Sequence, residues 1–441
     1  IPVSDTISVS ALNTLAGKTA GVVTATLAAA SLSSFGSLST AATDNITITV
    51  DDANTTAVNA TDLSALGNKT AGTVTVSNAV AITGNHDQVT AALVTSGSKV
   101  EVSAATVTIN DAGGTAITAT ELSAIGGATT GTVTVTNAVD ITGTADQAIA
   151  ALHTSSSKVL VTDAVVTLSD DPDLTELGQL NDATSGAIRI STRNKTYSGT
   201  ASALASALAG TITDNSGNTF NGAITITGDF PTTAQLKIIN DGTAGTITLP
   251  TGSSAFSGTA SDISSAMSGG SFTGDVTITG ADPSPTELQT INNATSGSIK
   301  IPDGSASFTS STAVLSQALA GTITDVSGNA LTGDITINDV NTTSLDASDL
   351  STIGSLTSGT VTVTHAVSIS GTTAEVIAAL VTSGSLVVVS DPTVTITDTP
   401  TITQLNSIVA KTTGVVTATL ATTAAADLAS LSTAATDVIT I

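Results

Sequence analysis

Apolar and polar positions follow one pattern that recurs eight times along the chain. Each copy has a leucine, Leu or Ile three residues later, Thr seven residues later, Gly nine residues later, and Val or Ile two residues after that glycine. The glycines lie 51 to 62 residues apart, about 56 on average. They anchor the eight repeats: Gly21, Gly72, Gly131, Gly186, Gly245, Gly297, Gly359 and Gly414. A recurring period of this length is typical of repeat proteins.

A short helix is predicted at the start of each repeat. Asp, Glu or Gln precedes the leucine in seven of eight repeats, and Ser or Thr precedes that residue in seven of eight. We expect the hydroxyl to cap the helix and the carboxylate to meet the positive end of the helix dipole. The leucine and its i+3 partner then share one face. The anchor glycine is expected to end the helix in the left-handed conformation.

Two strands are predicted in each repeat. After the anchor glycine, apolar residues alternate with polar ones, as at Val74 and Val76, which indicates a half-buried strand. A second strand reads aliphatic-Thr-aliphatic in every repeat, at residues 46–48, 107–109, 166–168, 224–226, 276–278, 335–337, 394–396 and 439–441. Between the two lie a looser helix, such as 144–152, and another short strand, such as 158–161.

These elements predict a repeat solenoid, mainly a parallel β-solenoid with short helices (an α/β-solenoid), with about two coils per repeat of about 56 residues. We expect residues 1–441 to form a single continuous array of about eight repeats. Stacked helices lie about 8–10 Å apart and stacked strands about 4.8 Å apart. A helix in every coil would therefore splay one side of the stack, and the sequence leaves that geometry open.

The repeats are related at a higher level. Residues 21–27 read GVVTATL, as do residues 414–420, and residues 38–44 recur unchanged at 431–437. Repeats two, three and seven resemble one another, while repeats four and six share a TD-x-SGN loop. The chain also begins at Ile1, without an initiator methionine or a signal segment. We expect a piece of a longer protein, or a chain whose ends associate head to tail.

Composition narrows the classes of function. Ten basic residues stand against 35 acidic ones, for a net charge of −25, which disfavours nucleic acid and anionic membranes as partners. No run approaches the ~18 apolar residues of a transmembrane helix. Cysteine is absent, so no disulfide or thiolate metal site is expected. Carbohydrate-processing β-helices need aromatic platforms and basic residues, and 2% aromatics supply few. We expect a protein that is not an enzyme.

A row of aspartates after the second strand is the candidate metal site. Its members are Asp51, Asp111, Asp170, Asp229, Asp282, Asp339 and Asp398. If they line one edge, like charges would favour a bound cation, and calcium is the only cofactor that the sequence suggests. The alternative is turn chemistry, because Asp and Asn start turns with their own side chains. The same two alternatives apply to the loops Asp214–Gly217–Asn218 and Asp325–Gly328–Asn329.

The histidines and the threonine rows are not expected to form a catalytic or ligand-binding site. His86, His153 and His365 lie at scattered positions without acids at metal-ligand spacing, so we expect them to face solvent rather than to act in catalysis. A threonine row raises the possibility of ice binding. However, Arg189 and Lys300 interrupt the outward row after the anchor glycine, which favours a cross-strand hydroxyl ladder that stabilises the strands.

The repeat pattern, in an acidic, Thr-, Ala- and Ser-rich chain without cysteine, resembles the repetitive regions of giant secreted cell-surface proteins of bacteria, especially the exoproteins of marine cyanobacteria. This resemblance implies an extracellular or cell-surface location and a structural role in a filament, surface layer or giant adhesin. The alternative is a cation-dependent or glycan-binding adhesion module. The expected partners are the chain itself, by head-to-tail or lateral association, or neighbouring repeats of a longer chain.

Overall fold

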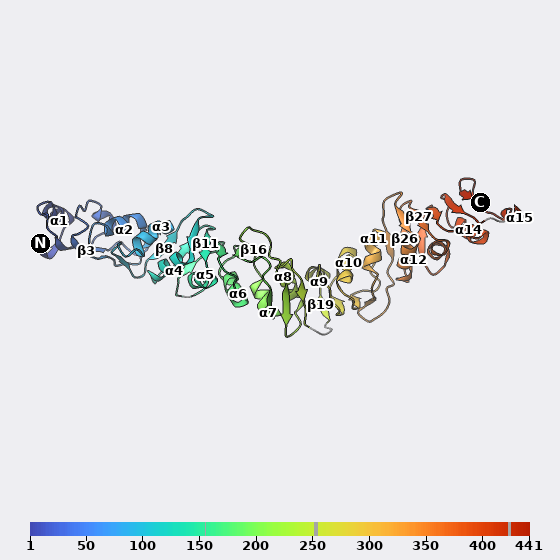
Figure 1. The fold of residues 1–441 in the computed structure, drawn as a ribbon, viewed down its shortest axis with the longest axis horizontal. Coiled ribbons are helices and arrows are strands. Elements are labelled where there is room, and N and C mark those ends of the chain that lie inside the picture. The colour runs from blue at the N-terminus through green and yellow to red at the C-terminus, as the bar shows by residue number, and fades with distance from the viewer. Residues whose placement is uncertain (155, 251–254, 422–424) are drawn as a thin grey trace. The chain divides into compact units, whose positions relative to one another are not determined.

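A computed structural model describes residues 1–154, 156–250, 255–421 and 425–441. These residues group into two compact units. Unit 1 comprises residues 1–228 and 242–248, and unit 2 comprises residues 229–241 and 249–441. In both units short helices alternate with short strands along the chain (Figure 1). Every ladder between two named strands is parallel.

Unit 1 contains the elements of the first four repeats and one strand, β18, of the fifth. Its helices are α1 Val9–Ala16, the 3-10 helix η1 Leu32–Phe35, α2 Ala60–Gly67, α3 His86–Leu93, α4 Ala119–Gly127, α5 Ala145–Leu152, α6 Leu174–Ala183 and α7 Ala201–Ala207. Its strands are β1 Pro2–Ile7, β2 Thr24–Leu27, β3 Asn45–Val50, β4 Ala57–Asn59, β5 Val74–Val76, β6 Ala81–Gly84, β7 Val100–Val102, β8 Thr106–Ile109, β9 Ala116–Thr118, β10 Val133–Val135, β11 Asp140–Gly143, β12 Val159–Leu160, β13 Val165–Leu168, β14 Ile188–Ile190, β15 Tyr197–Thr200, β16 Ile212–Asp214, β17 Ile224–Thr227 and β18 Ile247–Thr248.

Unit 2 has the same alternation. Its helices are α8 Thr233–Asp241, α9 Ala260–Met267, α10 Pro285–Ala294, α11 Thr312–Ala318, α12 Ala347–Ser355, α13 Thr373–Val376, the π-helix η2 Ile377–Val381, α14 Ile402–Val409 and α15 Ala425–Leu428. Its strands are β19 Phe256–Gly258, β20 Val276–Ile278, β21 Ile299–Ile301, β22 Phe308–Ser310, β23 Ile323–Asp325, β24 Ile335–Ile337, β25 Ser344–Asp346, β26 Val361–Val363, β27 Ser368–Gly371, β28 Val387–Val389, β29 Thr393–Ile396, β30 Val416–Thr419 and β31 Val438–Thr440.

The strands form small sheets. Those of unit 1 have the orders β1-β2-β3-β5-β7, β12-β10-β8-β6-β4, β16-β14-β13-β11-β9 and β15-β17-β18. Those of unit 2 have the orders β19-β20-β21-β23, β22-β24-β26-β28 and β25-β27-β29-β30-β31. Within the described ranges, no helix is both long and apolar enough to cross a membrane.

The prediction of a repeat solenoid, mainly a parallel β-solenoid with about two coils per repeat, is wrong. The described residues form seven separate parallel sheets of three to five strands, which alternate with fifteen α-helices in an α/β pattern. Alternation of side chains identifies a strand but does not say where its ladder ends. Helices, packed about 8–10 Å apart, cannot keep step with strands about 4.8 Å apart, which favours short ladders. One continuous array over residues 1–441 stays a prediction.

The predicted leucine column is confirmed as the centre of the core. The leucine nine residues before each anchor glycine lies in the first helix of its repeat and is fully buried in all eight copies: Leu12, Leu63, Leu122, Leu177, Leu236, Leu288, Leu350 and Leu405. Its i+3 partner is buried in seven copies, and Leu15 is half-buried. Each buried leucine contributes about 1.5–3 kcal/mol. The aliphatic residues of the second strand column are buried beside them, as Val107 and Ile109 are.

The helix caps lie two residues earlier than predicted. In α4 the N-cap is Thr118, whose hydroxyl accepts a hydrogen bond from the Glu121 N–H, while the Glu121 carboxylate accepts one from the Thr118 N–H. The hydroxyl predicted to cap, Thr120, is the second helical residue. The acid before the leucine is therefore the third helical residue of a capping box, a motif that satisfies two free N–H groups. Helices α6, α10 and α14 begin with the same motif.

In seven of the eight repeats, the threonine two residues before the anchor glycine joins the repeat to the start of the strand before it. In repeat three, the Thr129 hydroxyl donates to the Ala105 carbonyl at 2.6 Å and accepts from the Gly131 N–H at 3.0 Å. The same pair of bonds recurs at Thr70, Thr184, Thr243, Thr295, Thr357 and Thr412. A buried hydroxyl needs such partners, so threonine is constant in this column.

The anchor glycine has a different role from the predicted one. None of the eight anchors has a positive φ, so none is a left-handed helix cap. Instead, a Cβ on Gly131 would lie 2.3 Å from the Ala105 carbonyl oxygen, the same oxygen that Thr129 contacts. Six other anchors approach the preceding strand equally closely. Glycine is therefore required by the close approach of two backbones.

A second position separates two groups of repeats. Five residues before the anchor, repeats two, three and seven have Gly67, Gly126 and Gly354, and a Cβ there would lie 1.6–1.9 Å from a serine carbonyl oxygen of the following loop. Repeats four, five and six have asparagine instead. Asn240 donates to the Ser265 carbonyl at 3.0 Å and Asn292 to the Gln317 carbonyl at 2.7 Å. In both groups of repeats, this position of the first helix contacts a backbone carbonyl of the second helix or of the loop after it.

The strand register places threonines opposite one another on neighbouring strands, while a stabilising role for this row of hydroxyls stays a prediction. Thr108 lies opposite Thr134, and Thr336 lies opposite Thr362. Arg189 interrupts the row between Thr167 and Thr213, where its guanidinium lies 3.2 Å from the Asp140 carboxylate.

Candidate functional site

Aspartates from the predicted row hold the N-termini of helices that precede them by about 25 residues. The carboxylates of Asp111 and Asp170 accept hydrogen bonds from the first N–H groups of α3 and α5, at 2.7 and 2.9 Å. Asp339 and Asp398 make the same bond to α11 and α13, each at 2.7 Å. These N–H groups have no partner within their own helix. The row therefore supplies helix caps from the following strand.

The other three members of the row are placed differently. Asp51 is exposed, and its neighbour Asp52 makes the cap, because the Asp52 carboxylate accepts from the Leu32 N–H of η1 at 2.6 Å. Asp282 is exposed and accepts from the Asp303 N–H at 3.1 Å. Asp229 is also exposed. Four of the seven predicted aspartates thus share one role, and a neighbouring residue takes that role in repeat one.

Calcium binding by this row stays a prediction. In the part of the chain that the structure describes, no three His, Cys, Asp or Glu side chains gather as they would around a metal ion. Hydrogen bonds from Thr373 lower the pKa of the Asp398 carboxyl, with the Thr373 hydroxyl as the first cause and its N–H as the second. Such a carboxylate already faces two donors.

The two TD-x-SGN loops have the geometry of tight turns. One oxygen of the Asp214 carboxylate accepts from the N–H groups of Ser216 and Asn218, both at 2.8 Å, and the other accepts from the Asn218 side chain at 2.8 Å. Asp325 makes the same three bonds in its loop. The bonds from Asn218 and Asn329 lower the pKa of the Asp214 and Asp325 carboxyls. Both carboxylates therefore face donors of their own loop, and ion binding by these loops stays a prediction.

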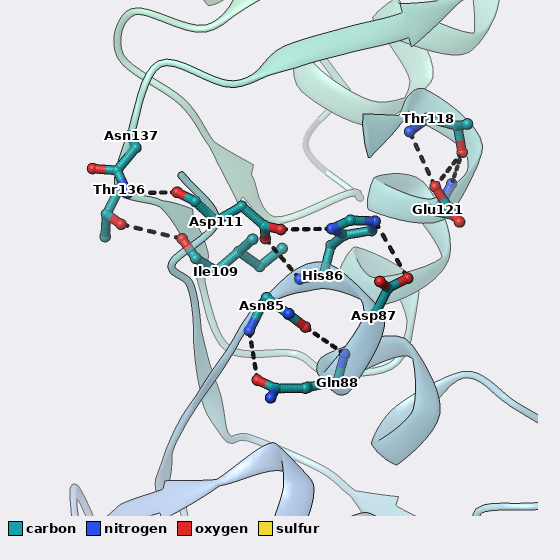
Figure 2. Close-up of polar contacts among 10 residues, drawn as sticks. All are labelled: Asn85, His86, Asp87, Gln88, Ile109, Asp111, Thr118, Glu121, Thr136 and Asn137. Atoms are coloured by element: carbon teal, nitrogen blue, oxygen red, sulfur yellow. Dashed lines mark hydrogen bonds and ion pairs between the residues drawn. The ribbon is translucent and has the colours of Figure 1, made fainter. Parts of the chain in front are cut away.

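His86 gives one of these caps an additional group (Figure 2). His86 is the first residue of α3, and its Nδ1 lies 2.7 Å from one oxygen of Asp111 while its N–H donates to the other oxygen at 2.7 Å. On the opposite side of the ring, Nε2 lies 3.4 Å from the Asp87 carboxylate. The imidazole is thus placed between two carboxylates, as Figure 2 shows.

Capping and strand contacts fix the two ends of this cluster. Asn85 caps α3 by accepting from the Gln88 N–H at 2.9 Å, and the Gln88 side chain accepts from the Asn85 N–H at 2.9 Å. Asp111 follows β8, and its carbonyl accepts from the Asn137 side chain at 2.6 Å. The backbone on both sides of the His86–Asp111 pair is therefore held by its own hydrogen bonds.

The expectation that all three histidines face solvent is wrong for His86. Its side chain is only 13% exposed, and that of Asp111 is 6% exposed. His153 and His365 are exposed, as expected. The sequence held a signal for the difference: the equivalent first helical residue is Ala145 in repeat three and Thr373 in repeat seven. A histidine in that column is a departure from its own repeats.

The two ring nitrogens of His86 have different roles in this arrangement. An ionised carboxylate can only accept hydrogen bonds, so the short contact with Asp111 requires the proton of a neutral His86 on Nδ1. The lone pair is then on Nε2, which faces Asp87 near the surface. Such a nitrogen can accept a proton or bind a metal ion.

No known protein-family model matches this chain, and a search of curated proteins finds no significant match. The resemblance to giant bacterial exoproteins therefore stays a prediction.

Proposed function

We propose that this chain is a structural, non-catalytic component of an extracellular filament, surface layer or giant adhesin. Its partners are further copies of itself, in head-to-tail or lateral association, or neighbouring repeats of a longer chain. Its location is outside the cell or at a bacterial cell surface.

The observation that carries the proposal is how the repeat-wide residues are used. The buried leucine packs the core, the threonine bonds the carbonyl of the preceding strand, and the anchor glycine permits that approach. These three columns serve contacts between neighbouring segments of the backbone. A chain that repeats such residues in eight copies repeats the contacts by which each segment packs on the next. Packing of this kind is typical of structural repeat proteins.

The surface composition supports an exported protein. Only 10% of the residues are charged, and the balance of charge is strongly acidic. Threonines stand opposite one another on adjacent strands, as Thr108 and Thr134 do. A hydroxyl-rich, acidic surface keeps a large protein soluble and repels nucleic acid and anionic lipid.

Electron microscopy of the purified chain over a range of concentrations tests the assembly. We expect filaments or ordered lateral arrays, with a mass by light scattering that grows with concentration. Monodisperse single chains at every concentration would contradict self-association.

Antibody labelling of intact source cells tests the location independently. We expect labelling of intact cells and of the culture medium, with a cytoplasmic protein as the negative control. Labelling that depends on breaking the cells would contradict an extracellular role.

A further inference from the structure

We propose that two copies of this chain associate side by side through β28, Val387–Val389, which pairs antiparallel with the same strand of the second copy. The inference rests on the proposed structural role, because it names the surface for lateral association. β28 lies at the end of the sheet β22-β24-β26-β28, so one of its edges pairs with no strand in the part of the chain that the structure describes. An open sheet edge is a template for a further strand.

The backbone of β28 presents hydrogen-bonding groups at this open edge. The Leu386 carbonyl accepts from the Val361 N–H of β26 at 3.0 Å. Because backbone groups alternate in direction along a strand, those of Val388 also face β26, while those of Val387 and Val389 face away from it. The Val387 N–H contacts the hydroxyl of a nearby serine at 3.5 Å, which is longer than an ordinary hydrogen bond. A further strand would therefore meet donors and acceptors at two residues.

The side chains at this edge are apolar and exposed. Leu386 and Val388 are 37% and 54% exposed, and Val387 and Val389 are half-buried, whereas the valines at both ends of β26 are buried. Leu386 also has a φ of 55°, a conformation that costs about 1–2 kcal/mol for a residue with a side chain. Neither burial nor backbone preference accounts for a leucine at this position within a single chain.

Repeats two and three have the same edge but protect it with charge. β7, Val100–Val102, and β12, Val159–Leu160, also end their sheets, and the residues before them, Lys99 and Lys158, both have a φ of 58°. Glu101 is the exposed middle residue of β7. Lysine on an edge strand is one way in which proteins prevent edge-to-edge pairing. Repeat seven has leucine in place of this lysine, so β28 lacks the protection of the other two edges.

A second copy is the occupant that these residues favour. All three residues of β28 are valine, so antiparallel pairing about a two-fold axis at Val388 places valine opposite valine at every position. Pairs of β-branched residues stabilise adjacent strands. The net charge of −25 opposes contact between copies, but residues 382–390 carry no charge. Two copies can therefore approach closely at this edge.

Sedimentation equilibrium of the full chain over a range of concentrations tests the pairing. One pair of three-residue strands is smaller than a stable interface of about 1,200–2,000 Å², so we expect a weak monomer–dimer equilibrium. Val388→Glu should weaken the association about tenfold, because two glutamates would face each other across the two-fold axis.

Leu160→Glu is the matched control. Leu160 is 59% exposed on β12, at the place of Val388 on β28, and its substitution should leave the equilibrium unchanged. Both positions are exposed, so both variants should fold, which circular dichroism checks. An equal shift of the equilibrium in the two variants would overturn the proposal.

Disulfide cross-linking gives a second measurement, because the native chain has no cysteine. In the proposed pair, the Cβ atoms of residue 388 in the two copies lie about 4.5–5.5 Å apart, close to the separation in a disulfide. We expect Val388→Cys to form a covalent dimer under mild oxidation, and Leu160→Cys to form one much more slowly. A Val388→Cys chain that stays monomeric at every concentration would exclude a second copy and leave the edge to a different partner.

This inference and the proposed function can fail separately. If electron microscopy shows the same filaments or arrays for the native chain and for Val388→Glu, the structural role stands and the β28 contact is overturned. If Val388→Cys forms the covalent dimer but the native chain forms no filaments or arrays, the β28 contact stands and the filament is lost.

Discussion

Repeats two and three contain the same elements in the same order but differ in a few residues. Positions that face a neighbouring backbone are alike: Thr70 and Thr129 both bond a carbonyl, and Gly67 and Gly126 both press against one. Positions at turns and helix starts differ. His86 stands where repeat three has Ala145. Contacts with neighbouring backbone thus fix a residue, while positions without them are free to acquire chemistry.

The largest effect is expected from a side chain placed where two backbones touch. A Cβ on Gly126 would lie 1.6 Å from the Ser157 carbonyl oxygen, whereas nothing lies within 4 Å of one on Gly127. We expect Gly126→Ala to lower the free energy of unfolding by about 3 kcal/mol or more. Gly127→Ala, at the exposed end of α4, should raise it by about 0.5–1 kcal/mol. Urea unfolding measures both, and equal midpoints for the two variants would contradict the contact.

Removing a buried hydroxyl should have the next largest effect. Thr129→Val leaves the Ala105 carbonyl and the Gly131 N–H without their partner, at a cost of about 1–3 kcal/mol. Thr70→Val should cost the same in repeat two.

Thr134→Val, on the exposed face of β10, is the control and should be nearly neutral. Thermal denaturation of the three variants measures the difference. A Thr129→Val protein as stable as Thr134→Val would show that the column does not depend on hydrogen bonding.

In the turn before the first helix, repeat two has the strained residue and repeat three has glycine. Thr55 has φ of 64°, and Gly114 occupies the equivalent place in repeat three with φ of 78°. A β-branched residue in this conformation is strained by about 1–2 kcal/mol. We expect Gly114→Thr to destabilise the protein by about 1 kcal/mol. Thr55→Gly should stabilise it only slightly, because relief of the strain is partly offset by the greater chain entropy that glycine loses on folding.

Chemical denaturation of these two variants checks the sign of each change. Thr342, with φ of 64° in repeat seven, offers a third copy, and Thr342→Gly should behave as Thr55→Gly does. A stable Gly114→Thr variant would show that the turn adapts to its residue.

The smallest effect concerns pH and the cap of repeat seven. Because hydrogen bonds lower the pKa of Asp398 in the folded state, the folded protein binds fewer protons than the unfolded chain. The stability from this group is present above the unfolded pKa of about 3.9 and is lost as pH falls through the lower folded pKa. Asp398→Asn should flatten that part of the stability curve.

Circular dichroism melts between pH 7 and pH 2 measure this dependence. Asp229→Asn is the matched control, because Asp229 belongs to the same column but caps no helix among the described residues. Identical stability curves for the two variants at low pH would show that the Asp398 cap does not contribute to acid stability.

The sequence predicted the elements well because they depend on local patterns. Leu122 and its i+3 partner Ile125 identify the α4 face, and Val107 and Ile109 identify β8. The fold class could not be derived in this way, because the end of a ladder depends on how helices and strands pack together. The sequence predicts the cap of α4 two residues too late, because Thr120 also places a hydroxyl before Glu121.

The site was harder to predict than the fold elements. The aspartate column was visible, but whether Asp111 faces a cation or a helix depends on α3, which lies 25 residues earlier in the chain. The role of Gly131 was also hidden, because the close approach involves the Ala105 carbonyl of another repeat segment. The sequence does distinguish His86, because repeat three has Ala145 at the equivalent position.

The threonine bond described above has an evolutionary consequence. Its acceptors are the backbone carbonyls of residues as different as Ala105, Gly222 and Pro392. Because the hydroxyl recognises no particular side chain, one copy can succeed another without leaving an unpaired group at the junction. Insertion or loss of a whole copy would therefore keep this bond at the new boundary.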